Sequence, residues 1–182
     1  MDAALARLID QIQTARAAKG RLRIAGGDTK AFYGETAQGE LLDVKPLAGI
    51  SAYEPSELVV TVRGGTLLSE LEAALSEKNQ HLAFEPPRFG EASTVGGMVA
   101  AGLSGPARAT AGAVRDHLLG ATVINGRGEV LSFGGQVMKN VAGYDVSRVL
   151  AGSMGTLGVI AEVSLKVLPQ PTASATLRFE LD

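Results

Sequence analysis

Apolar residues recur with a helical period in two parts of the chain. Between residues 2 and 18 they fall at the i, i+3, i+4 and i+7 spacing of an amphipathic helix, which Gly20 ends. The same spacing returns between residues 66 and 78, with Thr66 as the predicted N-cap and Asn79 as the predicted stop. The apolar positions are Leu5, Leu8, Ile9, Ile12 and Ala15 in the first helix, and Leu67, Leu68, Leu71, Ala74 and Leu75 in the second.

Shorter apolar runs and period-two alternation predict strands. From Leu157 to Val167 every odd position is apolar, which is typical of a strand with one buried face. Asn125-Gly126 lies between two apolar runs and predicts a hairpin turn, with residues 113–117 as a polar connector before it. The predicted strands are 22–25, 41–44, 49–53, 58–62, 118–124, 129–133 and 157–167.

A glycine-rich turn, Gly26-Gly27-Asp28-Thr29, follows the first predicted strand. Consecutive backbone amides in such a turn can point into one concavity and bind an anion, above all a phosphate. A plain turn is the alternative, and the Asp28 carboxylate would repel a diphosphate unless it points away.

A second candidate cradle begins after Pro86-Pro87, which forces an extended entry. Ser93 and Thr94 precede a predicted helix over 95–102 whose side chains are small or apolar. A ligand could lie flat against its start and meet hydroxyls and first-turn amides. The alternative is a Gly/Ala helix packed tightly on a sheet.

A third turn, GSMGTLG, has Gly152, Gly155 and Gly158 directly before the last strand, and a short helix predicted to begin at Asp145 precedes it. Three glycine-rich turns beside strands exceed what folding requires. They favour an extended, phosphate-bearing ligand that several distant segments contact.

Composition narrows the function classes. The chain has 182 residues, 46% of them hydrophobic and 20% charged, which is typical of a soluble globular protein. A net charge of -2 and the lack of any basic stripe argue against a nucleic-acid partner. No apolar run approaches the ~20 residues of a transmembrane span. The sequence has no GxxxxGK[ST], HExxH, GxSxG or GxGxxG motif, which disfavours nucleotide triphosphates and ordinary NAD binding.

Metal and thiol chemistry are also disfavoured. Cysteine is absent, and the two histidines, His81 and His117, lie in unrelated segments. We therefore predict no metal site and interpret both histidines as surface or hydrogen-bonded structural residues.

At this point the motifs resemble a known family. The chain is similar to FAD-binding domains of the vanillyl-alcohol oxidase (PCMH) type, a group that includes D-lactate and glycolate dehydrogenases. The likeness rests on the GGDT turn, STVGG, the hairpin, KN-x-x-GYD and GSMGTLG, and so covers nearly the whole chain. The run from Gly134 to Pro169 is most similar to the FAD-binding subunits of bacterial glycolate oxidases.

The resemblance implies a set of cofactor-binding residues. Gly26, Gly27, Asp28 and Thr29 would wrap the FAD diphosphate, and Pro86, Ser93, Thr94, Gly96 and Gly97 would complete the cradle toward the ribityl chain. Gly155, Val159 and Ile160 would lie against the other end of the cofactor. Lys139, Asn140, Tyr144 and Asp145 also match, and we interpret them as ordering a loop and capping a helix. Because the turns offer neither Cys nor His, FAD is expected to be non-covalent, and a bulky residue at Gly27 or Gly97 is expected to abolish its retention in a folded protein.

The implied fold is α+β, with two α/β lobes at residues 1 to about 80 and 81 to about 170, and FAD in the cleft between them. Residues 171–182 would begin a C-terminal cap domain, which makes the chain a fragment or a truncated product. In this family the substrate and acid-base residues lie largely in that cap, so no catalytic residue is predicted here.

The implied function is oxidation of a 2-hydroxy acid, glycolate to glyoxylate, with the flavin as hydride acceptor. A D-lactate or other D-2-hydroxyacid dehydrogenase is an alternative, and so is a non-catalytic assembly subunit. The expected partners are a second flavoprotein subunit and an iron-sulfur subunit. We expect a cytoplasmic location. The alternative is peripheral contact with the inner membrane through the complex.

Overall fold

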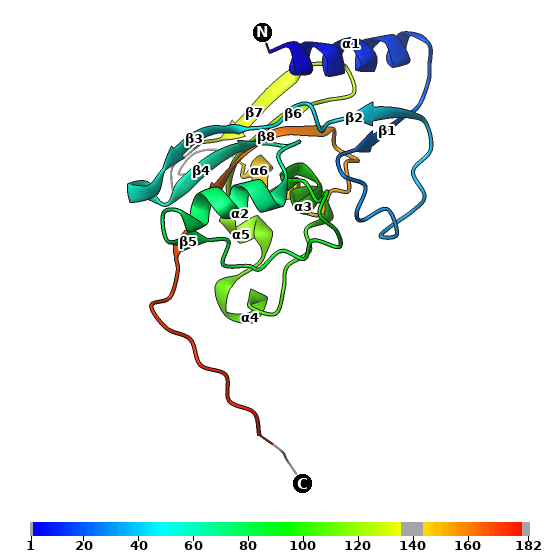
Figure 1. Ribbon diagram of the computed structural model, residues 1–182. Coiled ribbons are helices and arrows are strands. Elements are labelled where there is room, and N and C mark those ends of the chain that lie inside the picture. The colour runs from blue at the N-terminus through cyan, green and yellow to red at the C-terminus, as the bar shows by residue number, and fades with distance from the viewer. Residues whose placement is uncertain (1, 136–143, 180–182) are drawn as a thin grey trace.

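The computed structural model describes residues 2–135 and 144–179, and it confirms an α+β architecture. An antiparallel sheet of five strands has the order β3-β4-β8-β6-β7. In Figure 1 helices α2, α3 and α5 lie on one side of this sheet, and α1 lies on the other. The sheet strands are β3 (Ile50–Glu54), β4 (Val59–Arg63), β6 (Leu118–Ile124), β7 (Val130–Gly134) and β8 (Val159–Lys166).

Strand β8 is the centre of the sheet, and its burial differs from the predicted pattern. It begins at Val159, lies between β4 and β6, and is buried throughout except at the half-buried Glu162 and Lys166. A bulge opposite β6 inserts Ala161 between the partners of Thr122 and Val123. Consequently Val159 and Ala161 pack with α1, whereas Val163 and Leu165 pack with α2 and α3. The odd positions are apolar as predicted, but they do not share one face.

The smaller lobe consists of α1 (Ala3–Ala17) and a parallel pair, β1 (Leu22–Ala25) with β2 (Glu40–Asp43). Its core residues Leu8, Ile12, Leu42, Val44 and Leu47 pack against Ile124, Val159 and Ala161 of the large sheet. Strands β3 and β4 belong to the large sheet. In the structure the smaller lobe thus ends near residue 47, whereas the boundary expected from the sequence lies near residue 80.

The helices that cover the sheet differ from the sequence prediction at some of their ends. Helix α2 (Leu68–Ser76) has Leu67 as its N-cap, because the buried Thr66 hydroxyl instead accepts from the Gly49 amide at 2.9 Å. The helix ends at Ser76 with Glu77 as its C-cap, and the predicted stop, Asn79, follows with a positive φ of 53°. The predicted polar connector 113–117 contains a helical turn, α5 (Val114–His117).

Three further elements lie around the sheet: α4 (Arg108–Ala111), α6 (Val146–Val149) and a 3-10 turn over Pro55–Glu57. Strand β5 (Gln80–His81) pairs with β9 (Leu168–Pro169). Beyond β9 the chain leaves the body of the molecule as an extended segment (Figure 1), and residues 173–179 form no strand. The cap domain that this segment was expected to begin remains a prediction. Among the described residues no helix is both long and apolar enough to span a membrane.

Candidate functional site

The three glycine-rich turns meet at one cleft. A cavity of about 700 Å³ lies between residues 23–37 of the smaller lobe and residues Thr94, Gly97, Met154 and Thr156. An adjoining pocket of about 100 Å³ shares several of these residues and has a largely apolar wall. The combined volume of the cavity and this pocket suits an extended ligand. Ten predicted residues line the two: Gly26, Gly27, Asp28, Thr29, Thr94, Gly96, Gly97, Gly155, Val159 and Ile160.

The first turn offers unoccupied amides. Within the described chain the amides of residues 26–30 have no hydrogen-bond acceptor, whereas those of Ala31 and Tyr33 donate to the carbonyls of Asp28 and Lys30. The Asp28 carboxylate accepts from Arg23 Nη1 at 2.9 Å. The Asp28 carboxylate is thus held in an ion pair with Arg23, which offsets the repulsion that its charge would exert on a diphosphate.

The second turn differs from its prediction, because its amides already have acceptors. The amides of Val95 and Gly96 donate to the carbonyls of Thr66 and Gly64, at 2.9 and 2.8 Å. The Thr94 hydroxyl caps helix α3 (Val95–Ala101) by accepting from the Gly97 amide at 3.3 Å. The start of α3 therefore contributes a wall of small residues to the cleft, and its amides donate to the protein itself.

The third turn is fastened across the end of α3. The amides of Gly152 and Met154 donate to the carbonyls of Val99 and Ala100, at 3.0 and 2.9 Å. Gly102 ends α3 with φ of 65°, and an added Cβ there would lie 2.8 Å from the Gly152 backbone. This close approach brings Gly155 and the start of β8 to the cleft.

The glycines of the cleft fall into two groups. A Cβ on Gly27 would lie 1.6 Å from the Ala92 carbonyl oxygen, and one on Gly26 would lie 2.3 Å from Thr94 Oγ1. These two glycines let the first and second turns touch. A Cβ on Gly97 would meet only Thr94 Oγ1, at 3.1 Å, and one on Gly155 would meet only Ile24, at 3.5 Å. Space therefore lies in front of Gly97 and Gly155. One side of the cleft offers free amides and the other is a wall without side chains, and this arrangement fits an extended dinucleotide such as FAD.

Two predicted residues lie away from this cleft wall. Pro86 lines a separate pocket of about 410 Å³, together with Glu72, His81 and Glu85. Ser93 is buried, and its hydroxyl accepts from Lys30 Nζ at 2.9 Å.

Of the residues that matched KN-x-x-GYD, Lys139 and Asn140 fall outside the described residues. Tyr144 is 95% exposed. Asp145 caps α6 as predicted, because its Oδ1 accepts from Ser147 Oγ and from the Arg148 amide.

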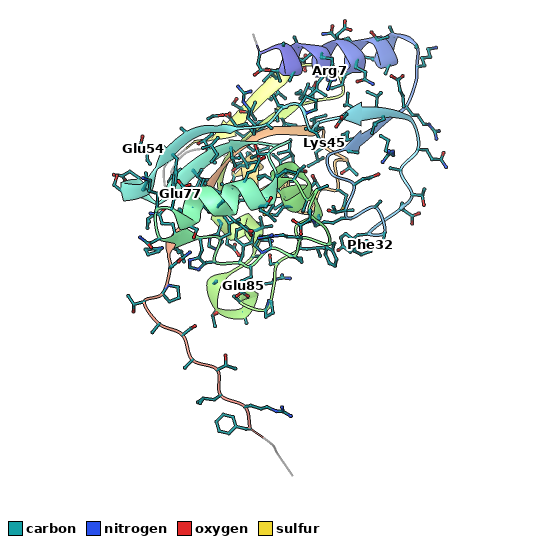
Figure 2. The ribbon with its side chains drawn as sticks, viewed as in Figure 1. Arg7, Phe32, Lys45, Glu54, Glu77 and Glu85 are labelled. Carbon is teal, nitrogen blue, oxygen red and sulfur yellow. The ribbon has the colours of Figure 1, made fainter. Side chains whose placement is uncertain are left out.

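Sequence analysis missed Lys30 and an aromatic pair beside it. Phe32 and Phe89 meet edge to face with their ring centroids 5.1 Å apart. Figure 2 shows Phe32 where the loop after β1 reaches the loop that precedes α3. A lone lysine and two loop phenylalanines carry no motif, so only the contact between the two loops could have identified them.

The histidines take no part in the cleft. His117 is buried, with Nε2 2.9 Å from the Ala111 carbonyl oxygen and Nδ1 3.3 Å from that of Lys166. His81 lines the separate pocket, and its buried Nδ1 has no partner among the described residues. The part of the chain that the structure describes contains no group of three or more His, Cys, Asp or Glu able to hold a metal ion.

Comparison with known proteins agrees with this geometry. The chain is 52% identical over 174 residues to glycolate oxidase subunit GlcE of Escherichia coli, which covers 96% of this chain and 50% of that subunit. It is 33% identical to a D-lactate dehydrogenase of Anaerostipes hadrus and 32% identical to glycolate oxidase subunit GlcD of Bacillus subtilis, covering 76% and 78% of this chain but only 29% and 30% of theirs. The chain thus spans half the length of the first relative and less than a third of the others.

The fold itself is shared with a solved alkyldihydroxyacetonephosphate synthase. That likeness has a TM-score of 0.73 at 23% identity and covers 91% of this chain and 30% of the synthase. A family model described as an FAD binding domain matches residues 4–134, a range that contains the first two glycine-rich turns. This chain therefore belongs to the FAD binding domain family, and its cofactor is FAD.

Proposed function

We propose that this chain is the FAD-binding part of a subunit in a glycolate oxidase or dehydrogenase complex that oxidises glycolate to glyoxylate. The observation that carries the proposal is the meeting of three glycine-rich turns at one cleft, with free amides at residues 26–30. The 52% identity to a glycolate oxidase subunit supports the choice of substrate. When bound, FAD supplies a flavin that accepts the hydride.

The residues of this chain would bind and orient the cofactor. The amides of residues 26–30 are placed to hold the diphosphate, and the lack of a side chain at Gly97 allows close approach. We propose non-covalent binding, because no histidine or cysteine is among the described residues that line the cleft.

Among the described residues that line this cleft, none is an evident base for the substrate hydroxyl. Asp28 is paired with Arg23, and the only other carboxylate among the described residues of the cleft is that of the exposed Glu35. We therefore propose that the acid-base group comes from outside these residues. A second flavoprotein subunit and an iron-sulfur subunit are the proposed partners, and the proposed location is cytoplasmic, with membrane contact through the complex. Fractionation of cells that express the complex tests the location.

Reconstitution tests the redox role. The chain, within its complete subunit, would be combined with the partner subunits as wild type and as Gly97→Leu, whose side chain would enter the cleft. We expect glycolate oxidation to fall together with the flavin content of this subunit. Full activity of a complex whose subunit lacks FAD would show that the redox role is wrong.

The lack of an evident base among the described residues of the cleft favours one alternative of another class, a non-catalytic assembly subunit. Full activity in the experiment above would support that role. A D-lactate or other D-2-hydroxyacid dehydrogenase is the alternative within the class, and it would be distinguished by turnover of D-lactate in preference to glycolate by the complete subunit alone.

A further inference from the structure

Lys30 joins the first and second turns at the edge of the cleft. Its ammonium donates to Ser93 Oγ at 2.9 Å and to the Arg88 carbonyl at 3.4 Å, and lies 5.9 Å from the ring centroid of Phe89. Ser93 is 1% exposed, so this anchor point is fixed. The amine is therefore held in one place, and Lys30 is one of the residues that line the cleft.

The positive charge of Lys30 has no counter-charge in the described chain. Both of its acceptors are neutral, and it forms no ion pair with any described residue. The nearest acid in sequence, Asp28, is paired with Arg23, and Glu35 is exposed. Burial lowers the pKa of the Lys30 amine, because desolvation disfavours its charged form. A partly buried, unpaired ammonium with one donor to spare favours an anionic ligand.

The hydrogen bonds of the backbone amides also indicate that a diphosphate would bind next to Lys30. The start of α3 cannot offer the amides of Val95 and Gly96, which donate to the carbonyls of Thr66 and Gly64. Free donors for a diphosphate are then concentrated at residues 26–30, next to Lys30. Lysine is a well-suited point charge for phosphate groups.

We propose that Lys30 places a positive charge against the diphosphate of FAD, while its contacts with Ser93 and Arg88 hold the first and second turns at the spacing this requires. The inference rests on the binding of FAD at this cleft, but not on the oxidation of glycolate.

The test combines variants with a series of ligands. Lys30→Met keeps the apolar stem and removes the charge, Lys30→Arg keeps the charge, and Lys45→Met removes an exposed lysine outside the cleft. Binding of FAD, ADP and adenosine would be measured by calorimetry or competition at low and high salt. We expect Lys30→Met to weaken FAD and ADP by about 10- to 100-fold, to leave adenosine unchanged and to flatten the salt dependence, with Lys30→Arg close to wild type.

Equal losses for adenosine and ADP would overturn the proposal, since they would show that Lys30 only supports the loops. Unchanged FAD and ADP affinities in Lys30→Met would overturn it too, whereas a wild-type chain that binds neither ligand would contradict the proposed function. A second measurement does not need the variant to fold. The pKa of the Lys30 amine, followed by NMR in the wild type, should rise when ADP binds, and a pKa that does not move would refute the ion contact.

Discussion

The turn at residues 26–30 and the turn at residues 93–97 are both glycine-rich and border one cleft, yet they use glycine differently. Gly27 is needed because the Ala92 backbone occupies the place of its Cβ, and the amides around it are free. Gly97 has open space in front of it, whereas the amides of the nearby Val95 and Gly96 donate to protein carbonyls. The first turn thus supplies donors and the second supplies room. A glycine in a sequence indicates a close approach, but not whether protein or ligand approaches.

The largest expected effect would break the first turn. In Gly27→Ala the added Cβ would lie 1.6 Å from a backbone oxygen, so one of the two loops must move. We expect a loss of about 3 kcal/mol or more in the free energy of unfolding, together with loss of FAD. Urea unfolding and the flavin absorbance of the purified protein measure both. This differs from the expectation of a folded, FAD-free variant, which the sequence alone suggested for Gly27. A control, Gly126→Ala, adds its Cβ where nothing lies within 4 Å and should change neither.

The next effect would separate the second turn from the first. Gly97→Leu projects a side chain into the cleft, where its Cβ meets only Thr94 Oγ1. We expect the protein to keep its stability, because a helical glycine costs about 0.5–1 kcal/mol relative to alanine. FAD affinity should fall by about 10- to 100-fold, in line with the cost of overpacking. Calorimetry with FAD and thermal unfolding of the same sample decide the matter. A variant that unfolds as readily as Gly27→Ala would erase the distinction between the turns.

The same contrast shows which features of the fold and the site could be predicted from the sequence. Helix α1, strand β1, the hairpin of β6 and β7 and the cap at Asp145 have local causes, and the sequence predicts all of them. The contacts that complete the site are long-range. Lys30 meets Ser93 across 63 positions, and the acceptors of the α3 amides come from the loop at Gly64–Thr66. The bulge at Ala161 likewise depends on the register with β6. Because no periodicity records such partners, the sequence could predict the glycine turns but not which of them has free donors.

A smaller effect would sharpen the electrostatics of the first turn. Arg23→Gln frees the Asp28 carboxylate, which lines the cleft. We expect little change in stability, since an exposed ion pair contributes about 0–1 kcal/mol. FAD binding should weaken about 3- to 10-fold at low salt, because a free carboxylate repels the diphosphate. The double variant Arg23→Gln/Asp28→Asn should recover the affinity. If the double variant binds no better than Arg23→Gln, the arginine itself contacts the ligand and the repulsion argument fails.

The smallest effect concerns the attachment of the lobe that carries the first turn. Asp2 caps α1 and pairs with Arg63 of β4, so it joins this lobe to the large sheet. The Ala4 amide, the Arg63 guanidinium and the Leu5 amide lower the pKa of Asp2 below its ordinary value of 3.8. A lowered carboxyl pKa stabilises the fold above the unfolded pKa, and this contribution is lost as the pH falls through the folded pKa.

Asp2→Asn keeps a good N-cap but removes the charge. The variant should therefore unfold at a slightly lower urea concentration than wild type at neutral pH. The gap should close below pH 3.8, as the wild-type carboxyl takes up its proton. FAD affinity at neutral pH should stay the same, because neither turn is touched. A gap that persists unchanged into acid would mean that the amide fails as a cap and that the charge of Asp2 contributes nothing. In that case the apolar contacts of Leu8 and Ile12 with the sheet would by themselves hold the first turn against the second.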